Sequence, residues 1–91
     1  MEVWSLFWDD ENDPEGNIEH IAEHDLTIDD VEHVLRNPID EGTSKSTGLL
    51  AAWGYTPDGR FIIVVYDVVA ENTVRVITAY EVPERKRKRR N

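Results

Sequence analysis

The sequence predicts an α+β fold in which two N-terminal helices pack on an antiparallel β-sheet of about four strands, in the order β-α-α-β-β-β. Two apolar runs, residues 61–65 and 74–77, are rich in β-branched and aromatic side chains, which is typical of strands covered on both faces. A short polar turn joins the runs, so they form a hairpin. Upstream, two segments carry apolar residues at helical spacing. We therefore expect a meander that both helices cover on one face.

The first strand is predicted over residues 2–8, where Trp4, Leu6 and Trp8 alternate on one face. This strand can pair at a sheet edge or with a partner. A polar loop containing a proline follows over residues 9–15. Residues 17–25 then read as a short helix with one apolar stripe, and the opposite side of this helix is predicted to carry Asn17, His20 and His24.

The second helix begins after Thr27, a suitable N-cap, with Asp30 three residues on as its capping-box partner. Its apolar stripe comprises Ile28, Val31, Val34 and Leu35. The Asn37-Pro38 pair ends the helix.

The remaining elements alternate loops and strands. Residues 38–48 are polar and small, which predicts a mobile loop, and residues 49–56 form the next strand. A Pro57-Asp58-Gly59 turn leads into the central strand over residues 60–68. After a turn at residues 70–72, the last strand covers residues 73–82.

Charge is distributed unevenly along a chain of 91 residues with a net charge of −9. Residues 1–83, predicted as one domain, hold 18 acidic and four basic residues. Residues 84–91 hold one acid and six bases, and we expect a disordered basic tail. A body this acidic repels nucleic-acid backbones and suits a basic partner. The tail is expected to solubilise the chain, to fold back on the acidic body, or to contact nucleic acid.

Composition also limits the class of protein. The chain has no cysteine, so disulfides and thiolate metal sites are excluded. It has no apolar run near the ~20 residues that span a bilayer, and its N-terminus lacks the features of a signal peptide. We expect a cytoplasmic protein with no membrane partner.

Several pieces, taken in order over residues 4–82, resemble the BrnT-type toxin family of bacterial toxin–antitoxin systems. These pieces are Trp8-Asp9, Asn17 with His24, the TIDDVEHVLRNP helix, Gly59-Arg60 leading into Val64-Val65-Tyr66, and Ile77-Thr78-Ala79. The resemblance implies that the chain is a divergent member of this family with a RelE-like fold. It also implies a ribonuclease activity that blocks translation on messenger RNA or the ribosome, and a cognate antitoxin as partner. Where the family has basic residues, this chain has Glu23, Tyr80 and Glu81. An alternative is therefore a catalytically inactive binding module on the same fold that pairs with a basic protein.

Four residues are candidates for metal-independent RNA cleavage. Arg60 matches the family's arginine and is the candidate for a phosphate contact, although a salt bridge to an acid is the alternative. His24 is the candidate acid–base group. Tyr66 shares strand parity with Arg60 and can orient a phosphate, stack a base or fill the core with its hydroxyl at the rim. Asn17 can orient His24 or cap a loop.

A metal-dependent enzyme is a third hypothesis, because His20 and His24 lie four residues apart on a helix. The spacing lacks a third ligand, so we expect no metal and no cofactor. A homodimer stays open as an alternative. We expect any site to form where the histidine face, the 38–48 loop and Arg60 converge.

Overall fold

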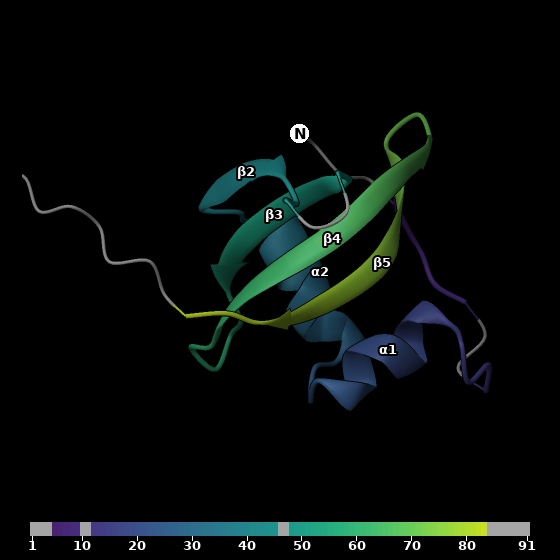
Figure 1. Ribbon diagram of the computed structural model, residues 1–91, viewed down its shortest axis with the longest axis horizontal. Helices are drawn as coiled ribbons and strands as arrows, with labels where there is room; N and C mark the ends of the chain where they lie inside the picture. The colour runs from purple at the N-terminus through teal and green to yellow at the C-terminus, as the bar shows by residue number, and fades with distance from the viewer. Residues whose placement is uncertain (1–4, 10–11, 46–47, 84–91) are drawn as a thin grey trace, which may run out of the picture.

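The computed structural model describes residues 5–9, 12–45 and 48–83, and these form a sheet with two helices on one face (Figure 1). The predicted basic tail and Trp4 lie outside the described residues. The elements in chain order are β1 (Ser5–Phe7), α1 (Asn17–Glu23), α2 (Ile28–Arg36), β2 (Asp40–Thr43), β3 (Leu50–Tyr55), β4 (Phe61–Ala70) and β5 (Thr73–Glu81). Neither helix within these ranges has the length and apolar character required to cross a membrane. The predicted α+β class is confirmed.

The sheet has five strands in the order β1-β5-β4-β3-β2, so two details of the prediction are wrong. β1 pairs with β5 in parallel, which makes the sheet mixed rather than antiparallel. Residues 40–43, predicted as part of a loop, form the edge strand β2 against β3. The side chain of Trp53 on β3 lies 3.5 Å from where a Cβ on Gly42 would be, so the glycine leaves room for this ring.

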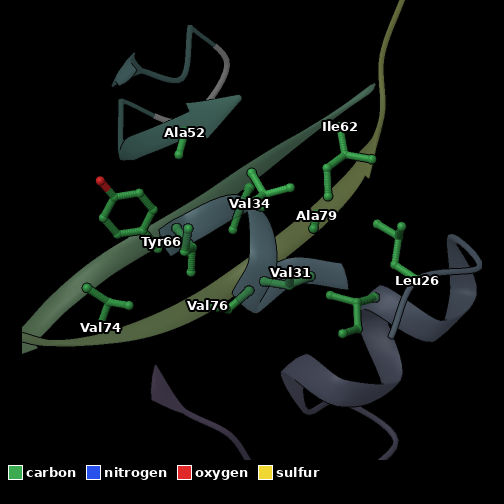
Figure 2. Packing of buried hydrophobic residues seen from close by; sticks show 12 residues of the cluster. Leu26, Val31, Val34, Ala52, Ile62, Tyr66, Val74, Val76 and Ala79 are labelled. Atoms are coloured by element: carbon green, nitrogen blue, oxygen red, sulfur yellow. The ribbon is translucent and has the colours of Figure 1, made fainter. Parts of the chain in front are cut away.

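The apolar run of β4 is buried on both faces, as predicted. Ile62 and Val64 belong to the main core beneath the helices, whereas Ile63 and Val65 belong to a smaller cluster on the opposite face. The main core also takes side chains from both helices, β3 and β5 (Figure 2). A register shift between Val65 and Tyr66 in their pairing with β5 changes the alternation. Both Val76 and Ala79 therefore face the main core despite their odd spacing.

The apolar stripe of α2 packs toward the sheet as predicted, with Val31, Val34 and Leu35 buried. Thr27 caps α2 and accepts a bond from the Asp30 backbone, while the Asp30 carboxylate accepts one from Thr27, so the predicted capping box is confirmed. α2 packs closely on β3, because a Cβ at Gly54 would lie 3.2 Å from Val34. α1 lies beside β5 (Figure 1). It is shorter than predicted and ends at Glu23, with His24 at its C-cap.

Candidate functional site

Arg60 lies at the start of β4 and is held by acidic groups from three parts of the chain. Its Nε donates to both carboxylate oxygens of Asp58, at 3.1 and 3.2 Å. One terminal nitrogen donates to the backbone carbonyl of Asp25 at 2.7 Å, and the other to the carboxylate of Asp30 at 3.3 Å. The side chain is 25% exposed. The salt-bridge alternative for this arginine is therefore what the structure contains.

The turn between β3 and β4 fixes Asp58 beside Arg60. The buried Thr56 hydroxyl accepts a bond from the Arg60 backbone at 2.9 Å and donates to the Asp58 carboxylate. Gly59 supplies the positive φ that this turn requires. The Thr56 hydroxyl, followed by the Arg60 guanidinium, holds the pKa of Asp58 below its usual value of 3.8. Asp58 in turn raises the pKa of Arg60, so the pair stays ionised.

The helical side of the arginine cluster is formed by the α1–α2 junction. Asp25 has a φ of 64°, a left-handed conformation, and this residue follows the end of α1. Asp30 Oδ2 accepts from both the Thr27 backbone and the Arg60 guanidinium. Arg60 thus links the β3–β4 turn to the helix junction and to the capping box of α2. We use the name arginine cluster for Arg60 with Asp25, Asp30 and Asp58.

His24 lies next to this cluster in the chain. Its side chain is exposed, and its ring centroid lies 5.7 Å from that of Tyr80 on β5, at an interplanar angle of 48°. Because His24 precedes Asp25, the imidazole and the Arg60 guanidinium come to the same end of the molecule. These are the two candidate site residues that the structure brings together.

Asn17 is not on the exposed side of α1 with His24, so that expectation is wrong. Only 2% of its surface is exposed. Its amide nitrogen donates to the carbonyls of Phe7 and Val76, both at 3.0 Å, and its amide oxygen accepts from the backbone of Asp9 at 2.8 Å. These bonds join α1 to β1, to β5 and to the loop that connects β1 with α1. Two roles were predicted for Asn17, orienting His24 or capping a loop, and the structure shows the loop cap.

Asp9 completes the environment of Asn17. One oxygen of its carboxylate accepts from the Asn17 backbone at 3.0 Å and from a terminal nitrogen of Arg75 at 2.8 Å. A carboxylate at a helix N-terminus satisfies an otherwise unpaired N–H and opposes the helix dipole favourably. Arg60 and Arg75 are therefore both paired with aspartates.

Tyr66 is a core residue with an exposed fraction of 4%. Figure 2 shows its ring among the main core side chains, with the hydroxyl oxygen at the margin of the group. It lies six residues from Arg60 along β4, which corresponds to roughly 20 Å at the rise of a strand. The two side chains therefore do not share one compact site, and the rim alternative for this hydroxyl is the one that the structure contains.

Burial, followed by the nearby charge of Glu41, raises the pKa of Tyr66 above its usual value of 10.0. The folded state then keeps a proton that the unfolded state loses near pH 10, so the free energy of unfolding falls as pH rises above that value. We expect Tyr66→Phe to lose less stability than the wild type between about pH 8 and pH 11. Urea unfolding at both pH values measures this difference. Equal losses of stability in the two proteins would contradict a raised pKa for Tyr66 in the folded state.

The predicted convergence of the histidine face, the 38–48 loop and Arg60 is wrong for the hairpin end of that loop, whereas Ile39 lies beside Trp53 and Gly54, toward the Arg60 end of the sheet. Leu50 pairs with Tyr66 and Tyr55 pairs with Phe61, so the tip of the β2–β3 hairpin lies toward the Tyr66 end of β4. Arg60 and His24 lie at the other end. From the sequence, Asp58 is expected only as a turn residue, and its contact with Arg60 is not predicted. Its position two residues before Arg60, in a turn, is the local signal for this contact.

Acidic side chains dominate the described surface. Exposed acids in the described ranges are Asp13, Glu15, Glu23, Asp25, Asp29, Asp40, Glu41, Asp58, Asp67, Glu71 and Glu81, against the exposed bases Arg36 and Lys45. Within those same ranges, no three histidine or acidic residues are grouped in a way that could hold a metal ion. The described surface therefore carries an excess of negative charge, which attracts cationic groups and repels phosphates.

Comparison with known proteins gives a family but no function. A family model described as a domain of unknown function, DUF4258, matches residues 18–81, from α1 to the last residue of β5. No curated protein and no solved structure matches the chain. Because the match covers well over half of the sequence, the chain belongs to the DUF4258 family.

Proposed function

We propose that the protein is a binding module that pairs with a basic protein, and that this partner is the cognate antitoxin of a BrnT-like toxin–antitoxin pair. One observation carries the proposal: the guanidinium of Arg60 is occupied by Asp58, Asp30 and the Asp25 carbonyl. A ribonuclease needs that cation on a phosphate, whereas here the surrounding carboxylates would repel one. The excess of exposed carboxylates favours a cationic partner. If the partner is such an antitoxin, we expect the protein to be in the cytoplasm.

The test is a titration of the full chain with the basic protein encoded by the adjacent reading frame. We expect a stable complex whose affinity falls as salt rises, because exposed carboxylates supply part of the attraction. The same purified chain should leave ribosome-bound messenger RNA intact. Specific cleavage of that RNA by the pure protein, together with no binding of the basic protein, would overturn the proposal.

A second candidate is the BrnT-like ribonuclease toxin itself. The observation in its favour is that the exposed His24 imidazole and the Arg60 guanidinium lie at the same end of the molecule. An imidazole and a cation are two of the groups that metal-independent RNA cleavage uses. This candidate requires RNA to displace the carboxylates from Arg60.

Expression in bacteria separates the two candidates. The binding module predicts normal growth and translation at high expression, because the cation is already neutralised. The toxin predicts growth arrest that is lost in His24→Ala, with His33→Ala as a control because that histidine is also exposed and lies on α2. Arrest by the wild type that only His24→Ala relieves would favour the toxin.

A further inference from the structure

The sheet has a second apolar face, on the side away from the helices. Figure 1 shows both helices on one face of the sheet, and a separate apolar cluster lies on the other. We call it the outer cluster, and its main members are Trp53 on β3, Ile63 and Val65 on β4, and Ile77 and Tyr80 on β5. A mostly antiparallel sheet with one face in water normally carries polar side chains on that face. Apolar side chains on both faces are instead the pattern of a sheet that is covered on both sides.

Part of the outer cluster remains accessible. Ile63 and Val65 are buried, with exposed fractions of 6% and 1%. The side chains beside them, Trp53, Ile77 and Tyr80, are partly exposed. The two helices cover the opposite face, although His24 after α1 contacts Tyr80. Aromatic and branched apolar side chains that are exposed together mark surfaces where another protein binds.

The width of the outer cluster suits a single helix. Ile63 pairs with Trp53 on one side and with Tyr80 on the other, so these three residues form one row across β3, β4 and β5. Neighbouring strands lie roughly 4.8 Å apart, which makes the row about 10 Å wide. An α-helix with its side chains has a diameter of about 10–12 Å. One helix lying on the row would therefore cover it.

Exposed carboxylates border the outer cluster on two sides. Asp40 on β2 lies opposite Trp53, and Asp67 lies on the same face of β4, two residues beyond the cluster. Arg75 is opposite Asp67, but its guanidinium is paired with Asp9. Asp40 also accepts the backbone N–H of the next residue, and an exposed carboxylate has room for further donors. Both carboxylates therefore suit a lysine or arginine at the flank of a bound helix.

We propose that the outer cluster binds an amphipathic helix of a basic partner protein. The apolar side of that helix would pack on the cluster beside Trp53 and Ile77, and its lysine or arginine residues would contact the two bordering aspartates, Asp40 and Asp67. The inference rests on the proposed binding function and names the surface that it uses. A second copy of this chain is a less suitable occupant, because residues 1–83 hold 18 acidic and four basic residues and two copies repel each other. The arginine cluster takes no part.

The test uses the full chain with labelled isoleucine methyl groups, and a short amphipathic helical peptide of leucine and lysine as the probe. At saturating peptide the Ile63 and Ile77 resonances should shift, because both residues lie in the outer cluster. Those of Ile21 and Ile62, in the main core, should stay in place. A peptide of the same composition whose leucines no longer lie on one side should bind at least about tenfold more weakly. Equal affinity for both peptides, or shifts confined to Ile21 and Ile62, would overturn the inference.

Two lysine substitutions form a matched pair. Ile77→Lys places a cation inside the outer cluster and should weaken the peptide at least about tenfold. Val68→Lys is the control, because Val68 is also a β-branched residue but lies opposite Val74, on the face that the helices cover. It should change the affinity less than about twofold. Thermal unfolding checks that both variants remain folded, and unchanged affinity in folded Ile77→Lys would contradict the inference.

A second pair of variants tests the bordering carboxylates. Asp40→Asn combined with Asp67→Asn should weaken the peptide and reduce the dependence of its affinity on salt. Glu15→Gln combined with Glu23→Gln changes the net charge equally, at exposed positions before and within α1. The control should retain most of the affinity. Equal losses in the two double variants would show that only net charge matters and would contradict the assigned contacts.

The remaining outcomes separate this inference from the proposed function. If the basic protein of the adjacent reading frame binds without shifting the Ile63 and Ile77 resonances, the inference fails and the proposed function stands. If neither the peptide nor that protein binds, both fail. A dimer of the free protein that Ile77→Lys dissociates would identify a second copy as the occupant and would overturn the inference.

Discussion

Asn17→Ala is expected to destabilise the protein by about 3 kcal/mol, a large effect for a single substitution. The change removes the three side-chain hydrogen bonds of Asn17 to Phe7, Val76 and Asp9. It leaves the Phe7 and Val76 carbonyls and the Asp9 N–H without these partners, and buried unpaired polar groups are costly. Urea unfolding followed by circular dichroism measures the loss.

Two variants provide the comparison for Asn17. Asn37→Ala also removes an asparagine side chain that bonds to a backbone carbonyl, but its bond to His33 is exposed. We expect it to cost less than about 1 kcal/mol. Asn17→Asp has nearly the shape of the wild type but places a carboxylate against two carbonyl oxygens, so it should be at least as destabilising as Asn17→Ala. An Asn17→Ala variant as stable as Asn37→Ala would contradict the conclusion that the Asn17 side chain holds α1 to β1 and β5.

Arg60→Met is expected to cost about 2 kcal/mol, which lowers the melting temperature of a domain of this size by roughly 10 °C. The variant loses the bonds that join the β3–β4 turn to the helix junction. It also leaves the Asp25, Asp30 and Asp58 carboxylates next to one another without a cation. The magnitude is moderate because Asp58 is exposed and its ion pair is screened by solvent. Differential scanning calorimetry measures the shift.

Arg36→Met is the matched control, since it removes an exposed arginine from the last turn of α2. It should cost less than about 1 kcal/mol. The pH dependence adds a second criterion. Because the pKa of Asp58 is lowered in the folded state, its contribution is present above its usual value of 3.8 and is lost as pH falls below it. The difference between wild type and Arg60→Met should therefore shrink in acid. A stability difference between wild type and Arg60→Met that stays constant with pH would contradict the ion pair between Arg60 and Asp58.

The stability role of Arg60 changes how a growth experiment is interpreted. An Arg60→Ala variant that no longer arrests growth would be expected from unfolding as well as from lost chemistry. His24 is exposed, and within the described part of the chain its side chain has no comparable set of hydrogen bonds, so His24→Ala separates the two explanations more clearly. This is why the growth test depends on His24 rather than on Arg60.

Local signals in the sequence were sufficient for the elements that depend on short-range contacts. The capping box of Thr27 and Asp30 and the apolar stripe of α2 were predicted because their partners lie within one or two helical turns. The burial of β4 on both faces followed from its unbroken apolar run. By contrast, β2 has the sequence DEGT, which has little intrinsic strand preference, and its conformation depends on pairing with β3.

The candidate site was harder to predict, because its contacts are long-range. Arg60 meets Asp25 and Asp30, which lie 35 and 30 residues away in the sequence. Asn17 reaches Val76 across 59 residues. A polar residue near a helical histidine suggested an exposed face, and only the approach of β1 and β5 shows that this asparagine is buried. Residue type therefore selects polar and charged candidates, while the topology decides which partners they contact.

The central claim is that acidic groups occupy the Arg60 guanidinium, and the most direct test observes this side chain. In an isotope-labelled full chain, the Arg60 Nε–H resonance should exchange slowly with water, because Asp58 accepts its hydrogen bond. The resonance should stay in place when a short RNA is added at about 0.1 M salt. A saturable shift of that resonance on addition of RNA, with cleavage of the same RNA, would contradict the claim that acidic groups keep Arg60 from binding phosphate.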